Sequence, residues 1–315
     1  MIRGGDERLA VVDVGSNSTR LLLCRTIGPR GPEGQRLSTI TALRRGAARD
    51  GSVAVDALAR LESVLSDYRR RIDEFAPAQT VAIGTSAVRD APNRAAVERL
   101  VERLLGVPLA VISGEREAEL AFRGARLALE DDDPAMVIDV GGGSTELVRG
   151  GPDGPDGRIS LRLGAVRCTD ALLHHDPPLP EELAALRAEA ERQVRGALEA
   201  IGGPARAVGV AGSACSLGGI HLGGYDPALV HRLRLPTATI AGIAARLAAT
   251  PLARLLQLPG LEPGRAPAIV AGTTLIATIL EVAGLEEMLV SERDLLEGAA
   301  LAVADGSLVS DVTIS

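Results

Sequence analysis

The sequence has no lysine, so all 34 of its basic side chains are arginine. A P-loop nucleotide site is therefore excluded, because the lysine of that motif reaches the phosphates. Cysteine is also scarce: Cys24, Cys168 and Cys215 are too few and too scattered for a disulfide framework or a CxxC metal site. The four histidines form no HExxH motif. Disulfide scaffolds and the common zinc sites are thereby set aside.

Aromatic residues are few, and no apolar run is long enough to span a bilayer. With two Phe, two Tyr and no Trp, the cores must be aliphatic. The apolar run 268–280 is interrupted by Gly272 and Thr273 and falls short of the roughly 20 residues that span a bilayer. The charged start of the chain is unlike a secretory signal, and the net charge of −7 disfavours non-specific nucleic-acid binding. We therefore expect a cytoplasmic protein without a membrane or nucleic-acid partner.

A repeated phrase is present in both halves of the chain. Residues 137–147 read VIDVGGGSTEL, and residues 11–21, which lie 126 positions earlier, read VVDVGSNSTRL. Without gaps, the two segments agree at seven of eleven positions. One such copy at long spacing predicts two domains of similar build, and 315 residues suit two domains of about 150 residues. We place them at 1–129 and 130–315, with a final helix at about 295–304 that can pack back on the first.

Strands and helices are predicted to alternate in both halves. The first half has predicted strands at 9–14, 20–26, 37–43, 80–84 and 109–112, and helices at 56–75, at 93–105 and after Ser113. The second has strands at 136–149 (a hairpin), 158–162, 206–211 and 288–290, and helices at 180–201, 239–248, 266–282 and 295–304. The order predicts an α/β fold with mixed sheets, each opened by a β-hairpin.

The repeated phrase has the composition of a phosphate-binding turn. Its apolar strand ends in Asp13 or Asp139, at the sheet edge where α/β folds bind ligands. The glycines that follow let the backbone approach a ligand closely, so that successive N–H groups surround phosphate oxygens. Ser144 and Thr145 add hydroxyl donors, and the carboxylates suit Mg²⁺. Either copy alone is also compatible with a structural hairpin. Two copies would face each other across a cleft and hold one phosphoryl group.

A third group of carboxylates follows the predicted strand that ends near Ile112. Glu115, Glu117 and Glu119 lie near the start of a helix, where carboxylates are expected simply because they compensate the helix dipole. Glu117 lies inside the first turns, where its side chain can lean back toward the cleft. A carboxylate there can take a proton from a water that attacks phosphorus, or orient that water. Glu117 is therefore a candidate base.

Several segments together resemble the Ppx/GppA family of exopolyphosphatases and guanosine pentaphosphate phosphohydrolases. They are DVGSNS at 13–18, GTSAVRDA at 84–91, ISG at 112–114 before Glu117, DVGGGSTEL at 139–147, LGAVR at 163–167, VAGS at 210–213 and SERDLLEG at 291–298. In this order they span nearly the whole chain. The resemblance, which is to the short two-domain members, implies two ribonuclease-H-like domains of the actin-like ATPase superfamily around a central cleft.

The resemblance also implies roles for individual residues. Glu117 would be the catalytic base, while Asp139 and Glu146 would organise Mg²⁺ and the attacking water, with Asp13 as a further metal residue on the opposite loop. Phosphate binding is implied for Gly15, Ser16, Asn17, Ser18, Arg20, Arg44, Arg89, Gly141, Gly142, Gly143, Ser144 and Thr145. Arg89 by itself would suit a surface ion pair with Asp90. Phosphoryl transfer needs mainly positioning and charge neutralisation, which fits this set.

The expected function is a Mg²⁺-dependent exopolyphosphatase that releases terminal orthophosphate from inorganic polyphosphate by water attack. Three alternatives stay open: a guanosine pentaphosphate 5′-phosphohydrolase, a non-catalytic sensor that binds guanosine tetra- or pentaphosphate, and a sugar or acetate kinase on the same superfamily fold. The presence of Glu117, Asp139 and Glu146 argues against the sensor. A homodimer is compatible with the family, and nothing in the sequence marks an interface.

Overall fold

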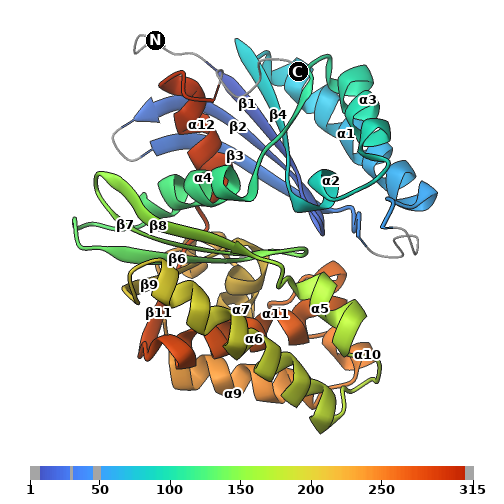
Figure 1. Cartoon of the computed structure of the whole chain (residues 1–315). Helices are drawn as coiled ribbons and strands as arrows, with labels where there is room; N and C mark the ends of the chain where they lie inside the picture. Colours follow the sequence, from blue (N-terminus) through green and yellow to red (C-terminus); the bar gives the residue numbers. More distant parts are fainter. Residues whose placement is uncertain (1–7, 29–30, 45–50, 309–315) are drawn as a thin grey trace. The chain divides into compact units, whose positions relative to one another are not determined.

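The structure is a computed structural model that describes residues 8–28, 31–44 and 51–308 (Figure 1). The chain divides into two compact units: unit 1 comprises Met1–Leu127 together with Leu295–Ser315, and unit 2 comprises Ala128–Asp294. The division predicted from the sequence was between residues 129 and 130. The last described helix, α12 (Leu295–Ala304), belongs to unit 1 although it follows unit 2 in the chain.

Each unit opens with the hairpin that carries the repeated phrase. In unit 1, β1 (Leu9–Val14) pairs antiparallel with β2 (Ser18–Gly28), and in unit 2, β6 (Ala135–Val140) pairs with β7 (Thr145–Gly151). Every residue of β1 and of β6 is buried. Such continuous apolar runs are typical of strands covered on both faces. The prediction of a hairpin at the start of each sheet is confirmed.

The sheet of unit 1 has the strand order β3-β2-β1-β4-β5. The strands that join the hairpin are β3 (Gly31–Ile40), β4 (Gln79–Gly84) and β5 (Leu109–Val111), of which β4 and β5 run parallel to β1. One face packs on α1 (Val55–Phe75) and α3 (Arg94–Leu105), and the other on α4 (Gly114–Arg126) and α12 (Figure 1). Both interfaces are aliphatic, as the composition requires, with Tyr68 as a buried aromatic exception.

The sheet of unit 2 has the strand order β10-β11-β9-β6-β7-β8. Its further strands are β8 (Gly154–Leu161), β9 (Arg206–Val210), β10 (Arg234–Pro236) and β11 (Glu287–Val290). The helices are α5 (Ala165–Leu172), α6 (Pro180–Ala200), α7 (Ala211–Leu222), α8 (Pro227–Val230), α9 (Thr237–Ala248), α10 (Leu252–Leu255) and α11 (Ala266–Ala283). Because β9 and β11 run parallel to β6, the carboxyl ends of all three strands lie at one sheet edge.

The main differences from the predicted elements are short or glycine-rich helices. No helix is predicted from the sequence at α2 (Ser86–Arg89), at α5 or at α7. The α7 sequence, AGSACSLGGIHL, has no amphipathic pattern because its residues are small or buried almost all round. Periodicity therefore could not detect it. Its first residue, Ala211, has a left-handed φ of 61°.

Helix α11 is the longest apolar segment of the described chain. Together with the preceding turn it spans Pro263–Ala283, which is long and apolar enough to cross a membrane by length and composition alone. However, 83% of its most apolar window is buried inside the protein. The helix packs on α6, α9 and α5 and contributes to the core of unit 2, from Ala266 to Ala283. Its apolar character is thus explained by core packing.

The three cysteines are free thiols, and all are buried. Cys24 lies on β2 in the core beneath α12. Burial and the nearby charge of Glu297 raise the pKa of the Cys24 thiol to about 11. Glu297 itself is buried in the first turn of α12 and accepts two hydrogen bonds from Arg36 Nη1, each 2.7 Å long. This ion pair joins α12 to the sheet of unit 1.

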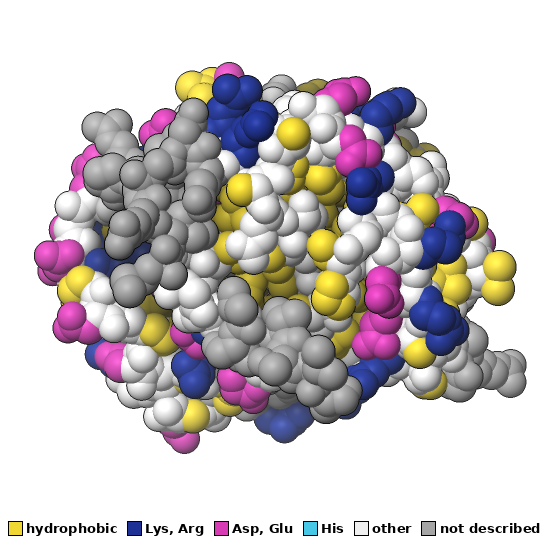
Figure 2. Space-filling view, turned by 90° about the horizontal axis from the view of Figure 1, so that it is seen from above, with side chains coloured by type: hydrophobic (Ala, Val, Ile, Leu, Met, Phe, Trp, Pro, Cys, Tyr) yellow, Lys and Arg dark blue, Asp and Glu magenta, His cyan; other side chains and the backbone are white. Residues whose placement is uncertain are grey.

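A small apolar cavity of about 130 Å³ lies at the amino ends of β4 and β5. Its lining includes residues 79–82, Val107, Pro108 and Val303. Figure 2 shows hydrophobic side chains gathered in a hollow of the face that it views. The turns with the predicted functional residues follow the opposite, carboxyl ends of these strands. The cavity is therefore separate from those turns.

Helix α12 lies so close to α4 that only glycine fits at one point of contact. A Cβ added to Gly298 would lie 1.7 Å from the Leu120 carbonyl oxygen. We expect Gly298→Ala to lower the free energy of unfolding by about 1–3 kcal/mol, since α12 or α4 must shift. Gly196→Ala is the control, because a Cβ there meets open space on α6 and should stabilise by roughly 0.5–1 kcal/mol. Urea unfolding measures both, and equal effects would contradict the close contact.

Candidate active site

Three segments follow the strand ends at the carboxyl edge of the sheet in unit 1. The parallel strands β1, β4 and β5 end at Val14, Gly84 and Val111, and their register places these ends side by side. Turn 1 (residues 15–18), helix α2 and the start of α4 follow them. All the sequence-predicted site residues of unit 1 lie in these segments, on β1 and β2 beside turn 1, or at Arg44. The carboxyl edge of parallel strands is where α/β folds place ligands.

Turn 1 is closed by its own backbone and held from outside by its carbonyl groups. The Gly15 N–H donates to the Ser18 carbonyl over 3.1 Å, and a Cβ at Gly15 would lie 2.8 Å from that oxygen. The Asn17 carbonyl accepts from the N–H groups of Thr41 and Ala42, and the Ser16 carbonyl from that of Arg44. With these carbonyls occupied by residues 41–44, the turn keeps one backbone conformation.

The side chains of turn 1 differ in their surroundings. Ser16 is buried, and its hydroxyl lies 3.0 Å from that of Ser86 at the start of α2. Ser18 is half-buried, as is Asn17, whose Oδ1 is a buried atom that accepts no hydrogen bond from any residue the structure describes. The Ser16–Ser86 contact fixes α2 against the turn. Because Arg89 is at the end of α2, this contact also holds Arg89 near turn 1.

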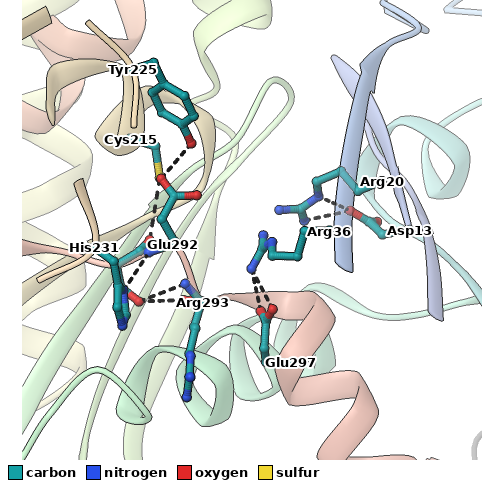
Figure 3. A network of polar contacts seen from close by, with 10 residues as sticks. Asp13, Arg20, Arg36, Cys215, Tyr225, His231, Glu292, Arg293 and Glu297 are labelled. Atoms are coloured by element: carbon teal, nitrogen blue, oxygen red, sulfur yellow. Dashed lines mark hydrogen bonds and ion pairs between the residues drawn. The ribbon is translucent and has the colours of Figure 1, made fainter. Parts of the chain in front are cut away.

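Asp13 and Arg20 face each other across the first hairpin. They are in-register partners of β1 and β2, and Arg20 donates from Nε and Nη2 to Asp13 Oδ2 over 2.8 and 2.7 Å (Figure 3). Asp13 is 2% exposed. The predicted metal residue and the predicted phosphate-binding arginine thus form one ion pair. Arg44, the other predicted arginine beside turn 1, lies 3.8 Å from a carboxylate oxygen of Asp90.

Glu117 is held at the start of α4. Ser113 caps the helix by accepting from the Arg116 N–H, and the Glu117 side chain, in the first turn, is buried at 8% exposure. Arg89 Nη1 donates to Glu117 Oε2 over 3.0 Å and to the Ile112 carbonyl over 2.9 Å. The partner of Arg89 is therefore Glu117 rather than the Asp90 considered from sequence. The two predicted groups, base and phosphate-binding cation, are brought together.

Unit 2 repeats the hairpin with a different pair of charges. Asp139 on β6 and Glu146 on β7 are in-register partners, at the positions equivalent to Asp13 and Arg20. They are 7% and 1% exposed. Ser160 on β8, the cross-strand neighbour of Glu146, donates to Glu146 Oε1 over 2.8 Å. Two buried carboxylates therefore lie at the positions of this hairpin where the hairpin of unit 1 has a carboxylate and an arginine.

Turn 2 (residues 141–144) is tethered by its carbonyl groups to α5. The Ala165 N–H donates to the Gly141 carbonyl, and the N–H groups of Val166 and Arg167 donate to that of Gly142. Arg167 also donates from Nε to the Gly143 carbonyl over 2.7 Å. The first N–H groups of a helix commonly bind an anion, but here those of α5 are used to hold the turn.

The two hydroxyls of turn 2 are placed differently. Thr145 is fully buried and donates its hydroxyl proton to the Leu163 carbonyl, so this side chain fixes the segment that leads to α5. Ser144 is buried at 6% exposure, and its carbonyl accepts from the Gly141 N–H over 3.0 Å. The same closure joins Gly15 and Ser18 in turn 1. The repeat thus extends to the backbone bonding of both turns.

Asp139 and Glu146 fit a magnesium ion better than Asp13 does. Among the residues that the structure describes, no group of three or more His, Cys, Asp and Glu side chains could hold a metal. Mg²⁺ is commonly bound through only one or two carboxylates, with water and substrate phosphates completing its shell. The neighbouring oxygens of Asp139 and Glu146 suit that mode. A direct Mg²⁺ bond to Asp13 Oδ2 would compete with its two hydrogen bonds from Arg20.

The structure adds supporting residues that the sequence analysis did not identify as part of the site. Ser86 and Arg167 lie inside segments singled out only as family matches. Ser160 gave no signal at all, because its role depends on the pairing register of β7 and β8. In unit 2, Tyr225, His231 and Glu292 form a further polar network near the end of β11 (Figure 3), in which Tyr225 donates to Glu292 Oε1.

Comparison with known proteins identifies similar chains over nearly the full length. A family model described as the Ppx/GppA phosphatase family matches residues 35–305. A curated relative named exopolyphosphatase 2, from Mycobacterium tuberculosis, is 33% identical over 318 residues, which cover 94% of this chain and 98% of the relative. An uncharacterized protein from Streptomyces coelicolor is 35% identical over 93% of this chain and 89% of its own.

Solved structures give the same result for the fold. An exopolyphosphatase from Cytophaga hutchinsonii has a TM-score of 0.88 at 26% identity, covering 95% of this chain and 98% of that one. The Ppx/GppA family member from Aquifex aeolicus has a TM-score of 0.79 at 27% identity, covering 98% and 99%. The predicted α/β fold with two mixed sheets is thereby confirmed.

The contact between turn 2 and α5 leaves no room for a side chain at Gly164. A Cβ there would lie 2.4 Å from the Gly143 carbonyl carbon and 2.5 Å from the Gly142 oxygen. We expect Gly164→Ala to displace turn 2 and to lower both the catalytic rate and the melting temperature. Gly151→Ala, where a Cβ meets nothing within 4 Å, should be much milder. Enzyme assays with thermal melts test this pair, and an active, stable Gly164→Ala protein would contradict the tether.

Proposed function

Because the chain belongs to the Ppx/GppA phosphatase family, we propose that it is a Mg²⁺-dependent exopolyphosphatase that releases terminal orthophosphate from inorganic polyphosphate. One observation carries the proposal: the buried Glu117 carboxylate, held by Arg89, lies at the same sheet edge as turn 1. A base and an anion-binding turn are the two parts that water attack on a phosphate requires. Relatives named exopolyphosphatase support the substrate class.

The turns supply the binding groups. With the Ser16 and Asn17 carbonyls held by residues 41–44 and the Gly15 N–H held by the Ser18 carbonyl, the N–H groups of Ser16 and Asn17 would donate to phosphate oxygens, and Ser18 and Asn17 would add polar side chains. Turn 2 is held in the same way by α5. Arg20, Arg44 and Arg89 supply positive charge next to turn 1. Fixed donors of this kind need no rearrangement when charge develops on the phosphoryl oxygens.

Glu117 would act on the attacking water. As the water oxygen bonds to the terminal phosphorus, the bridging P–O bond breaks and the shortened polyphosphate leaves with that electron pair. Glu117 takes the proton that the water loses. Its hydrogen bond from Arg89 fixes where the carboxylate points, and the remaining N–H groups of the Arg89 guanidinium can donate to the terminal phosphate. Arg89 would thus orient both reactants.

Asp139 and Glu146 would hold the magnesium ion in unit 2. Bound Mg²⁺ supplies positive charge that offsets the charge of the phosphate oxygens. Ser160 fixes one oxygen of Glu146. The adjacent carboxylates would also orient water at the metal, which is the second role assigned to Glu146.

The substrate could also be guanosine pentaphosphate, since the family includes enzymes for both compounds and the same terminal phosphate chemistry serves either. Polyphosphate is favoured by the names of the curated relatives. The ratio of kcat/KM for defined polyphosphate to kcat/KM for guanosine pentaphosphate decides between them. If kcat/KM is larger for guanosine pentaphosphate, this nucleotide replaces polyphosphate as the proposed substrate, and the proposed mechanism stays the same.

Replacing Glu117 by Gln should lower kcat by about 10²- to 10⁴-fold while polyphosphate still binds, because the amide cannot take the proton. Glu115→Gln is the matched control, as Glu115 is an exposed carboxylate in the same helical turn. Phosphate release from a defined polyphosphate measures both. Equal release by the wild type and Glu117→Gln would show that Glu117 is not the base.

Removal of divalent metal with EDTA should abolish phosphate release, and added Mg²⁺ should restore it. In Asp139→Asn, the Mg²⁺ concentration for half-maximal activity should rise by at least about 10-fold, because a charged ligand is lost. Asp156→Asn removes an exposed carboxylate from the same sheet and should leave the midpoint unchanged. A Mg²⁺ midpoint that is the same in Asp139→Asn and the wild type would remove Asp139 from the metal site.

A further inference from the structure

Helix α1 carries an arginine that reaches the segment that tethers turn 1. Arg60 donates from Nε to the Thr41 carbonyl over 2.8 Å and from Nη2 to the Ala42 carbonyl over 3.2 Å. On its outer side, Nη1 donates to Asp56, one helical turn earlier on α1, over 2.7 Å. The guanidinium therefore bonds two successive carbonyls of a segment that has no regular secondary structure. No function considered above uses this contact.

The bonded segment is the one that holds turn 1. The N–H groups of Thr41 and Ala42 donate to the Asn17 carbonyl over 3.0 and 2.8 Å, and the Arg44 N–H donates to that of Ser16 over 3.2 Å. Thr41 and Ala42 thus each donate an N–H hydrogen bond to turn 1 and accept a hydrogen bond from Arg60 at their carbonyl oxygen. A displacement of residues 41 and 42 must therefore displace the backbone of turn 1.

The segment also has a backbone conformation that needs support. Ala42 has a φ of 49°, in the left-handed region that residues with a Cβ rarely adopt because the Cβ lies too close to the following carbonyl oxygen. Such conformations persist where surrounding bonds determine them, and they occur preferentially at functional sites. The N–H and carbonyl of Ala42 are both bonded, to turn 1 and to Arg60. Arg60 is therefore placed to maintain the strained residue.

We propose that Arg60 is a positioning residue for turn 1: by holding the Thr41 and Ala42 carbonyls, it keeps the turn in the conformation that binds the phosphates of the substrate. The assignment of phosphate as the ligand rests on the proposed function. A planar guanidinium is required because Nε and Nη2 must reach two adjacent carbonyls at once, which the single ammonium of lysine cannot do in the same geometry. Arg60 acts through residues 41–44 and does not touch the substrate.

The test compares Arg60→Ala with Asp56→Ala, which removes the outer partner of Arg60 and leaves both carbonyl bonds. For polyphosphate hydrolysis, we expect kcat/KM of Arg60→Ala to fall by about 10- to 100-fold, with a raised KM, since a displaced turn misplaces the substrate. The Mg²⁺ concentration for half-maximal activity should not change, because it depends on Asp139 and Glu146 of unit 2. Asp56→Ala should differ from the wild type by less than about 2-fold, as expected for an exposed ion pair.

Chemical rescue separates positioning from general stability. Millimolar guanidinium should restore part of the kcat/KM of Arg60→Ala and should not raise that of the wild type or of Asp56→Ala. Arg60→Lys should remain impaired, although it keeps the positive charge. If Arg60→Ala does not fold, Arg60→Gln replaces it in every assay. Unchanged KM and kcat in the Arg60 variant, or an equal loss in Asp56→Ala, would overturn the proposal.

A second readout does not depend on turnover. Amide hydrogen exchange at Thr41, Ala42 and Arg44 should be faster in Arg60→Ala than in the wild type and in Asp56→Ala, because these N–H groups donate to turn 1. Calorimetry with tripolyphosphate should show weaker binding. If the wild type hydrolyses no polyphosphate, the proposed function is wrong. The hydrogen-exchange rates still test whether Arg60 positions turn 1, because they do not depend on turnover. Unchanged exchange at the three amides would refute that role.

Discussion

The candidate site depends on hydrogen bonds to the carbonyl oxygens of two short turns. A turn that presents N–H groups to an anion must keep its carbonyl oxygens, which repel that anion, away from it. In both units, backbone N–H groups from another segment bond these oxygens: residues 41–44 in unit 1 and the start of α5 in unit 2. An arginine side chain reinforces each arrangement, Arg60 indirectly and Arg167 directly. The glycines matter because these contacts leave little space for a Cβ.

The two units use this common scaffold for different purposes. At equivalent register positions, unit 1 pairs Asp13 with Arg20, whereas unit 2 pairs Asp139 with Glu146. The first pair balances a negative charge with a positive one. The second pair concentrates negative charge, which suits a cation. The two hairpins thus have similar backbones and differ in charge at one position of the second strand.

Much of the fold follows from local sequence patterns, and the contacts that hold the site do not. The hairpins and long helices are visible as apolar periodicity, and the equivalence of Arg20 and Glu146 can be read by aligning the two phrases. The pairing of Arg89 with Glu117 joins segments 28 residues apart through the packing of α2 and α4. Ser160 is placed by strand register, and helix α7 lacks any amphipathic signal. Such features depend on tertiary structure, which no local pattern specifies.

The membership of α12 in unit 1 has a consequence for the order in which the protein can form. One face of the unit 1 sheet is covered in part by residues 295–303, which a ribosome makes after the whole of unit 2. Unit 2 is continuous from Ala128 to Asp294, so its core is complete before that helix emerges. During synthesis, the apolar surface that α12 covers beside Leu9, Val11 and Leu22 therefore stays exposed until residues 295–303 emerge. The unit that begins the chain is the last to be finished.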